Sequence, residues 1–382
     1  MATLAAGPAQ AQSFIAFLTT LKEPALAAGI SAATFDAAIN GLVPDPAVIA
    51  LSRKQSEFTR PFWDYVNGAV SAPRLRAGGV AVQRAKRDLA AIGKQFGVSQ
   101  QVLAGIWGME SNFGTSMGDK DILRSLASLA FARYRGTFYA NEFIASLRIL
   151  QEGHSDRAGF VGSWAGGMGQ TQFIPSSFLK YAVDADGDGR KNIWSSTPDA
   201  LASAANHLKL DGWIAGSPWG FEVLLPQNFN FDFADRRDRH SFAIWAQLGV
   251  QPASGAGLPK QGAAGLFMPV GLPGPSFLIT DNFEVIRQYN TSDAYALGVG
   301  HLGDRLFGGA AIATPWPVNT RQLNTAELVQ VQTRLKALGY PIDKIDGKLG
   351  QQTRQGVQGF QRQQGLVPDG HPSRDILVKL KA

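Results

Sequence analysis

The sequence predicts a mainly α-helical protein with a small irregular or β-containing insert and more than one domain. The chain has 382 residues, which is more than one typical domain needs. Apolar residues recur at helical spacing from the start, as in Phe14, Phe17, Leu18 and Leu21. Between residues 215 and 275, proline and glycine are frequent and the helical spacing is lost. We therefore expect a helical region, then the insert, and then helices again.

Helix boundaries can be placed along most of the chain. Five prolines divide residues 13–91 into short helices: Pro24, Pro44, Pro46, Pro61 and Pro73. Ser99 is a suitable N-cap and Gly114 a suitable stop for a helix from Ser99 to Phe113. Further helices are expected at residues 121–129, 139–150, 175–181 and 199–210, and residues 281–306 are expected to be helical again. A short strand is expected at 221–225 inside the insert.

The charge of the chain argues against nucleic acid as a partner. The formal net charge is only +6 over the whole length. From Asn324 to the end, nine basic residues stand against five acidic ones, so most of the excess lies in the tail. A basic tail suits an acidic polymer as its partner, although a merely soluble surface explains it equally well.

The residue types and segments that are missing narrow the chemistry. No cysteine is present, which excludes disulfides, thiol nucleophiles and cysteine metal ligands. No apolar run approaches the roughly 18 to 20 residues that cross a bilayer, so no membrane span is expected. Residues 4–12 resemble the end of a secretory signal, with Ala9-Gln10-Ala11 as a small-x-small cleavage site. We therefore expect an exported, periplasmic protein whose signal is trimmed near Ala11.

One carboxylate lies on an otherwise apolar helix face. On a helix, Leu103, Ile106 and Trp107 share a face with Glu110. Removal from water disfavours a charged carboxylate, so a raised pKa is expected for Glu110. A carboxyl that stays protonated near neutral pH can donate its proton to a glycosidic oxygen. The other interpretation is that Glu110 pairs with an arginine in a helix contact.

Several motifs, in the right order, resemble those of one family. The segment Glu110-Ser-Asn-Phe-Gly114 resembles the lysozyme-like lytic transglycosylases. Downstream, the glycine-rich residues 162–178 closely resemble the second motif of the membrane-bound lytic transglycosylase B type. Matching segments continue at residues 181–189, 199–206, 212–213, 282–283 and 289–292, and the resemblance spans about Phe14 to Leu306.

This resemblance implies a lysozyme-like catalytic region over residues 13–308, with its core at about 90–215 and 276–308. It also implies the reaction. Glu110 protonates the oxygen between N-acetylmuramic acid and N-acetylglucosamine in peptidoglycan, then takes the proton of the muramic acid C6 hydroxyl, and a 1,6-anhydro end forms without water. A tethered hydroxyl needs no second carboxylate and no cofactor.

Two rival functions stay open at this point. One is a hydrolytic muramidase on the same scaffold, and the other is a wall-binding scaffold that is not catalytic. Most glycosidases use two carboxylates, and Glu142 is the other acid that remains under consideration.

The resemblance also implies which residues hold the sugar chain. Glycines at positions 162, 166, 167 and 169 let the backbone run close to a sugar. The expected substrate contacts come from Ser111, Ser163, Gln172, Tyr289, Asn290, Tyr65 and His207. His207 departs from the family, in which Tyr is usual, so an aromatic wall becomes smaller and titratable.

An acidic loop is a candidate cation site. Carboxylates stand at positions one, three and five of an EF-hand-like loop, and glycine stands at six. Position twelve is Ser195 instead of Glu, and the resemblance implies that Asp199 closes the site. The candidate ligands are Asp184, Asp186, Asp188, Arg190 and Asp199, around a structural Ca²⁺ that does no chemistry. The alternative is a turn capped by its own side chains.

The tail is expected to form a separate, small three-helix domain. Residues 309–323 have the composition of a linker, and residues 324–382 hold two similar halves. Each half has an apolar helix, then Gly339 or Gly365, then an Asp-Gly pair at residues 346–347 or 369–370. This pattern resembles the peptidoglycan-binding domain type 1, which implies retention on the wall. The second half departs at His371-Pro372, and the alternative is a plain packing module.

Overall fold

The computed structural model describes residues 8–53 and 60–381. The chain folds into two compact units, which are described one at a time. The first unit is Met1–Glu57 with Ala72–Asp211, and the second is Phe58–Ser71 with Gly212–Ala382. The short segment that contains α5 (Phe62–Ala69) therefore belongs with the second half of the chain.

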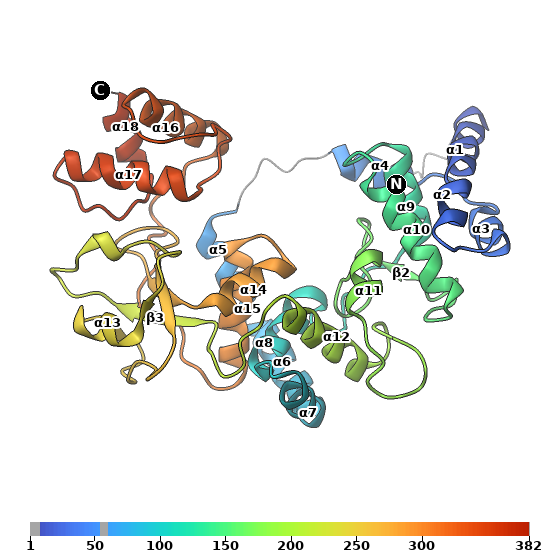
Figure 1. Ribbon diagram of the computed structural model, residues 1–382, viewed down its shortest axis with the longest axis horizontal. Helices are drawn as coiled ribbons and strands as arrows, with labels where there is room; N and C mark the ends of the chain where they lie inside the picture. The colour runs from blue at the N-terminus through green and yellow to red at the C-terminus, as the bar shows by residue number, and fades with distance from the viewer. Residues whose placement is uncertain (1–7, 54–59, 382) are drawn as a thin grey trace. The chain divides into compact units, whose positions relative to one another are not determined.

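The first unit is helical, as the blue-to-green part of Figure 1 shows. Its core holds large side chains that are fully buried, among them Phe14, Phe35, Phe143 and Phe178. A two-residue antiparallel ladder of β1 (Lys120–Asp121) and β2 (Val161–Gly162) interrupts the helices. The helices are α1 (Pro8–Thr20), α2 (Lys22–Ala27), α3 (Ala32–Ile39), α4 (Pro46–Arg53), α6 (Ala72–Arg84), α7 (Lys86–Phe96), α8 (Gln100–Ser111), α9 (Ile122–Phe131), α10 (Phe138–Gln151), α11 (Pro175–Tyr181) and α12 (Thr197–Leu210).

The second unit contains the insert, which is a five-stranded antiparallel sheet in the order β4-β6-β7-β3-β5. Its core packs around Trp245, whose indole N–H donates to the carbonyl of Ala264 at 2.9 Å. The strands are β3 (Gly220–Leu224), β4 (His240–Ser241), β5 (Gln251–Pro252), β6 (Ala263–Phe267) and β7 (Ser276–Ile279), and the helix α13 (Phe242–Gln247) follows β4. The predicted strand at 221–225 is β3, shifted by one residue.

Two helices follow the sheet, in the region that the sequence predicts to be helical. They are α14 (Asp281–Tyr289) and α15 (Asp293–Leu306). Asn290 adopts an extended backbone (φ −150°, ψ 122°), and Ser292 caps α15 by accepting from the amide of Tyr295, so the region predicted as helical over 281–306 holds two helices. In the second unit, α5 packs against α15.

The C-terminal residues form three helices, as predicted: α16 (Thr325–Ala337), α17 (Gln351–Gln363) and α18 (Arg374–Lys381). The two halves have matching turns. Gln332 accepts from the amide of Gly347 at 2.8 Å, and Gln361 accepts from the amide of Gly370 at the same distance. The stretch 309–323, expected as a linker, has no helix or strand, and the amides of Ala313 and Thr314 donate to Glu222 on β3.

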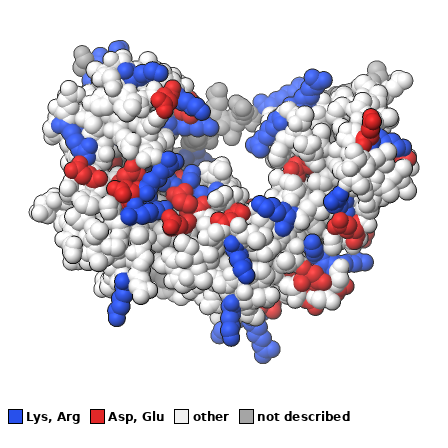
Figure 2. All heavy atoms as spheres, viewed as in Figure 1, with Lys and Arg blue, Asp and Glu red and all other residues white. Residues whose placement is uncertain are grey.

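The segment that resembles a secretory signal is described only in part. Residues 4–7 of the supposed signal lie outside the described residues, and Ala9-Gln10-Ala11 falls in the first turns of α1. In the part of the chain that the structure describes, no helix combines the length and apolar character needed to cross a bilayer. Acidic and basic side chains are interspersed on the face shown in Figure 2.

Candidate active site

Glu110 lies in the last turn of α8. The helix begins as predicted, because the side chain of Ser99 accepts from the amide of Val102. Leu103, Ile106 and Trp107 on the same face are at most 7% exposed, whereas Glu110 is half-buried. The apolar face therefore packs into the first unit, and the carboxyl stands at its end.

The turn after Glu110 has an uncommon backbone. Asn112, Phe113 and Gly114 have φ angles of 47°, 61° and 80°, a left-handed run that ends the helix abruptly. Ser111 holds this turn, because its hydroxyl donates to the carbonyl of Trp107 and accepts from the amide of Gly114 at 3.0 Å. Ser111 is 1% exposed, so the structure gives this predicted substrate contact a supporting position under Glu110.

The glycine-rich segment forms a tight turn that only small residues allow. Ser163 and Gly167 close it, with the amide of Ser163 donating to the carbonyl of Gly167 at 2.8 Å and the hydroxyl of Ser163 accepting from the amide of Gly167 at 2.9 Å. A Cβ atom on Gly167 would come within 2.9 Å of both the Ser163 hydroxyl and Gln172 Oε1. Ser163 and Gln172, both predicted as substrate contacts, are therefore neighbours.

Four contacts join this segment to the helix of Glu110 and the loop that follows it. The indole N–H of Trp107 donates to Oε1 of Gln170 at 2.8 Å. The side-chain amide of Gln172 donates to the carbonyl of Met117 at 3.0 Å, and a Cβ on Gly118 would overlap the backbone of Gly162. The β1–β2 ladder adds the pairing of Lys120 with Gly162. Two motifs that lie about 50 residues apart in sequence are thus held together at the end of the helix that carries Glu110.

Glu142, considered as a second acid, is buried and binds the start of α11. It is 4% exposed, and its carboxylate accepts from the amide and the hydroxyl of Ser176 at 2.9 and 2.7 Å. Both bonds lie at the first turn of α11, where a carboxylate stabilises the helix. Glu142 therefore supports the segment that follows Gln172.

His207 lies in a buried aromatic cluster of α11 and α12. Its ring stacks on Tyr181 with 4.0 Å between centroids and meets Phe173 edge-on. Nε2 is 3.0 Å from the carboxylate of Asp211, which also accepts from the Tyr181 hydroxyl. Burial lowers the pKa of His207 to about 4, so the ring is neutral at physiological pH. The side chain is only 8% exposed, and a direct sugar contact stays a prediction.

The remaining predicted contacts belong to the second unit. Tyr65 lies on α5, and Tyr289 and Asn290 lie at the end of α14. The ring of Tyr289 stacks on Tyr295 with 6.5 Å between centroids. Tyr65 and Tyr289 are half-buried and Asn290 is exposed. A substrate wall that combines these residues with those beside Glu110 stays a prediction.

The acidic loop brings three carboxylates together. Single oxygens of Asp184, Asp186 and Asp188 all lie within 4.8 Å of one another, and the three side chains are exposed. Such hard oxygen ligands suit Ca²⁺. Asp199 is fully buried and accepts three backbone amides, those of Ala185, Asp186 and Asn192, so it fixes the shape of the loop. Arg190 is exposed, and its amide donates to Asp188.

A family model described as the transglycosylase SLT domain matches residues 13–304, which is most of the chain. The chain belongs to this transglycosylase family. A second model, described as a putative peptidoglycan binding domain, matches residues 324–380. The family expected from the motifs is thus confirmed, and so is the mainly helical, lysozyme-like fold.

Individual relatives agree with the family. Membrane-bound lytic murein transglycosylase B of Escherichia coli (strain K12) is 34% identical over 215 residues, 54% of this chain and 57% of that protein. The match therefore spans little more than half the length of that relative. SltB3 from Pseudomonas aeruginosa, in complex with NAG-anhNAM-pentapeptide, is 43% identical with a TM-score of 0.90, over 97% of this chain and 99% of that one. The Escherichia coli lytic transglycosylase Slt35, in complex with calcium, is 27% identical with a TM-score of 0.62, over 78% and 92% of the two chains.

Sequence reasoning missed the residues that connect the motif around Glu110 with the glycine-rich motif. Trp107 was assigned to an apolar face, and Gln170 was not singled out. Gln170 is 5% exposed, donates to the carbonyl of Trp194 and accepts from Trp107. The available signal was a polar residue inside a run of glycines, but nothing in the spacing identifies its partner 63 residues away.

Proposed function

We propose that the protein is a lytic transglycosylase that cleaves the MurNAc-β-1,4-GlcNAc bond of peptidoglycan. The observation that carries this proposal is one half-buried carboxyl, Glu110, at the end of an apolar helix that is bonded to a glycine-rich segment. The family membership and the relatives named lytic transglycosylases support it. The solved complex of SltB3 with NAG-anhNAM-pentapeptide supports an anhydro product.

In this mechanism Glu110 acts twice. It first donates its proton to the bridging oxygen, and the bond between C1 of the muramic acid and that oxygen breaks. It then accepts the proton of the C6 hydroxyl of the same sugar, whose oxygen bonds to C1. The internal hydroxyl is already tethered, so it outcompetes water without a second carboxylate. The use of Glu142 as a cap for α11 agrees with a site that has a single acid.

Ser163 and Gln172 are placed to hold the sugar chain. Their polar atoms meet beside Gly167, because the missing Cβ of this glycine leaves room for both side chains. We assign Tyr65, Tyr289 and Asn290 to further subsites by the family motifs, and we assign the tail to binding of the wall. A periplasmic location follows from a wall substrate.

The acidic loop is proposed to hold a structural Ca²⁺. Asp184, Asp186 and Asp188 supply the carboxylates. Arg190 follows them in the loop, and the buried Asp199 fixes the shape of the loop by accepting from its backbone amides. The calcium complex of Slt35 supports this assignment. The ion would offset two of the three neighbouring negative charges and stabilise the segment between α11 and α12.

Clearing of purified sacculi tests the catalytic assignment. Glu110→Gln keeps the size of the side chain and removes the acid, so clearing should fall by a factor of about 10² or more. Glu23→Gln, on the exposed side of α2, is the matched control and should clear at the wild-type rate. Equal rates for Glu110→Gln and Glu23→Gln would reject Glu110 as the acid.

A further inference from the structure

The loop between α14 and α15 carries Tyr289 and Asn290, which are assigned to sugar binding. Tyr289 is the last residue of α14, Asn290 has an extended backbone, and Ser292 caps α15. Side chains on a loop are placed only as precisely as the elements on either side of the loop are held. The contacts between α14 and α15 therefore decide how well this loop can meet a sugar.

Arg236 connects the two helices that flank this loop. Its Nη2 pairs with Oε1 of Glu284 on α14 at 2.6 Å, and its Nη1 pairs with Oδ2 of Asp293, the first residue of α15, at 2.7 Å. Arg287 on α14 pairs with the same two carboxylates, at 2.7 and 2.6 Å. The four side chains form a closed ring of ion pairs that bridges α14 and α15 across the loop.

The side chain of Arg236 has little freedom to move. Only 14% of it is exposed, and its guanidinium lies over the rings of Phe267 and Phe283, 5.2 and 5.6 Å from their centroids. Burial opposes its charge, but the carboxylates of Asp293 and Glu284 outweigh burial and raise the pKa of Arg236 above its usual value. The planar fork that binds two carboxylates at once is specific to arginine, since a lysine ammonium lacks this geometry.

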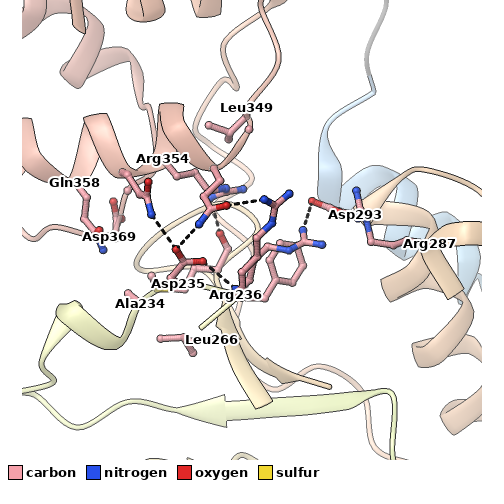
Figure 3. A pocket seen from close by; sticks show the side chains of 17 residues that line it. Ala234, Asp235, Arg236, Leu266, Arg287, Asp293, Leu349, Arg354, Gln358 and Asp369 are labelled. Carbon is pink, nitrogen blue, oxygen red and sulfur yellow. Dashed lines mark hydrogen bonds and ion pairs between the residues drawn. The ribbon is translucent and has the colours of Figure 1, made fainter. Parts of the chain in front are cut away.

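The neighbours of Arg236 in the chain are held by the C-terminal helices. Gln351 and Gln355 on α17 both donate to Oδ2 of Asp235, at 3.0 and 3.1 Å. The guanidinium of Arg237 donates to Oε1 of Gln351 at 2.6 Å. Figure 3 shows the side chains of Asp235 and Arg236 in the lining of one cavity, of about 120 Å³. Three consecutive residues of the insert thus connect α17 with the sugar-binding loop.

The loop forms part of the wall of a groove within the second unit. This groove has a volume of about 720 Å³, and Thr291 and Ser292 line it together with Tyr65, which is also assigned to sugar binding. Arg287 and Asp293 line the same groove. Two members of the ring therefore belong to the same wall as the loop, so a shift of the ring would change the shape that a sugar chain meets.

We infer that Arg236 is a positioning residue for substrate binding, which fixes the loop that carries Tyr289 and Asn290 and is itself braced by the C-terminal helices. This inference rests on the proposed function, which supplies the substrate and the role of the loop. Arg236 acts through the loop and not by contact with a sugar. The C-terminal helices then have a second task besides retention on the wall, because their contacts with Asp235 and Arg237 keep Arg236 in place.

Steady-state cleavage of soluble, peptide-bearing peptidoglycan tetrasaccharides by the full chain tests the inference. Arg236→Lys keeps the charge but cannot bridge two carboxylates, so KM should rise by about 5-fold or more while kcat changes by less than about 2-fold. A variant that merely lost stability would show the opposite, because unfolded enzyme lowers the apparent kcat and leaves KM unchanged. Arg362→Gln breaks an exposed pair between α17 and Asp232 and should change neither constant.

A double-substitution cycle with Asn290→Ala separates an effect through the loop from an effect elsewhere. With the Asn290 side chain absent, Arg236→Lys should raise KM by less than about half the factor that it does in the wild type. Effects of the two substitutions that simply multiply would overturn the inference, and so would a fall in kcat at constant KM.

The bracing by the C-terminal helices has a test that leaves Arg236 in place, so it also applies if Arg236→Lys does not fold. Gln351→Ala combined with Gln355→Ala removes the donors to Asp235, and KM should rise by about 3-fold or more with kcat unchanged. A wild-type KM in this double variant would show that the C-terminal helices do not brace the segment. The assay counts cleaved bonds whichever end forms, so products with reducing ends would reject the proposed function and leave these comparisons valid.

Discussion

The indole N–H of Trp107 donates to Oε1 of Gln170 at 2.8 Å, and both side chains are at most 7% exposed. This bond joins the helix that carries Glu110 to the segment that carries Ser163 and Gln172. This buried hydrogen bond is one of the four contacts that position the acid relative to the residues assigned to sugar binding in the first unit.

Gln170→Leu removes the acceptor and leaves a buried N–H group without a partner. We expect a loss of about 1–3 kcal/mol in the free energy of unfolding, measured by urea denaturation. Gln95→Leu, on the exposed side of α7, is the control and should stay within about 0.5 kcal/mol of the wild type. Equal stability of the two variants would mean that the Trp107–Gln170 bond contributes nothing.

Position 162 requires glycine because a side chain would not fit there, and not because of the backbone angles of this residue. A Cβ there would overlap the carbonyl of Gly167 and come within 2.7 Å of Ile122 Cδ1. Gly162→Ala should destabilise the protein by about 1–3 kcal/mol and lower activity, because the turn must open. Gly79→Ala in α6, where a Cβ has nothing within 4 Å, should instead stabilise by about 0.5–1 kcal/mol. Destabilisation of similar size in both variants would contradict this argument.

Removal of calcium should lower the melting temperature. EDTA leaves the charges of Asp184, Asp186 and Asp188 within 4.8 Å of one another without compensation, and we expect a Tm lower by several degrees by scanning calorimetry. Asp186→Asn should have a lower Tm in calcium and a smaller response to EDTA. A wild-type Tm that EDTA does not change would reject the ion, because a turn capped by its own side chains needs none.

His207 makes stability depend on pH in a defined window. Burial lowers its pKa to about 4 in the folded protein, from 6.5. The folded state therefore favours the neutral ring, and this stabilisation is complete above pH 6.5 and is lost as the pH falls from 6.5 towards 4, by up to about 3 kcal/mol. His207→Tyr should lose less stability than the wild type between pH 7 and 4.5 in urea titrations. Parallel pH curves for the two proteins would show that His207 does not titrate in this way.

The sequence predicts those parts of the fold that depend on residues close together in the chain. Ser99 caps α8 through its own side chain, and the predicted helix at 175–181 matches α11 in both ends. The order of the sheet depends on distant pairings, such as that of Phe221 with Leu278, which no local pattern contains. The same holds for α5, which packs on α15 in the other half of the chain.

In the candidate site, too, the sequence predicts features that lie within a few residues and misses those that depend on distant contacts. The motif around Glu110 and the spacing of the acidic loop are visible in the sequence, because each lies within a few consecutive residues. The role of Ser111 under the turn, the capping of α11 by Glu142 and the burial of His207 depend on neighbours that only the folded chain provides.

Mass spectrometry of the soluble fragments released from sacculi tests the central claim most directly. If Glu110 takes the proton of the C6 hydroxyl, wild-type fragments end in 1,6-anhydro-MurNAc and are one water lighter than hydrolysis products. Glu110→Gln should release neither kind at more than about one hundredth of the wild-type rate. Fragments with reducing ends that carry the oxygen of labelled water would contradict the account and identify a hydrolytic muramidase.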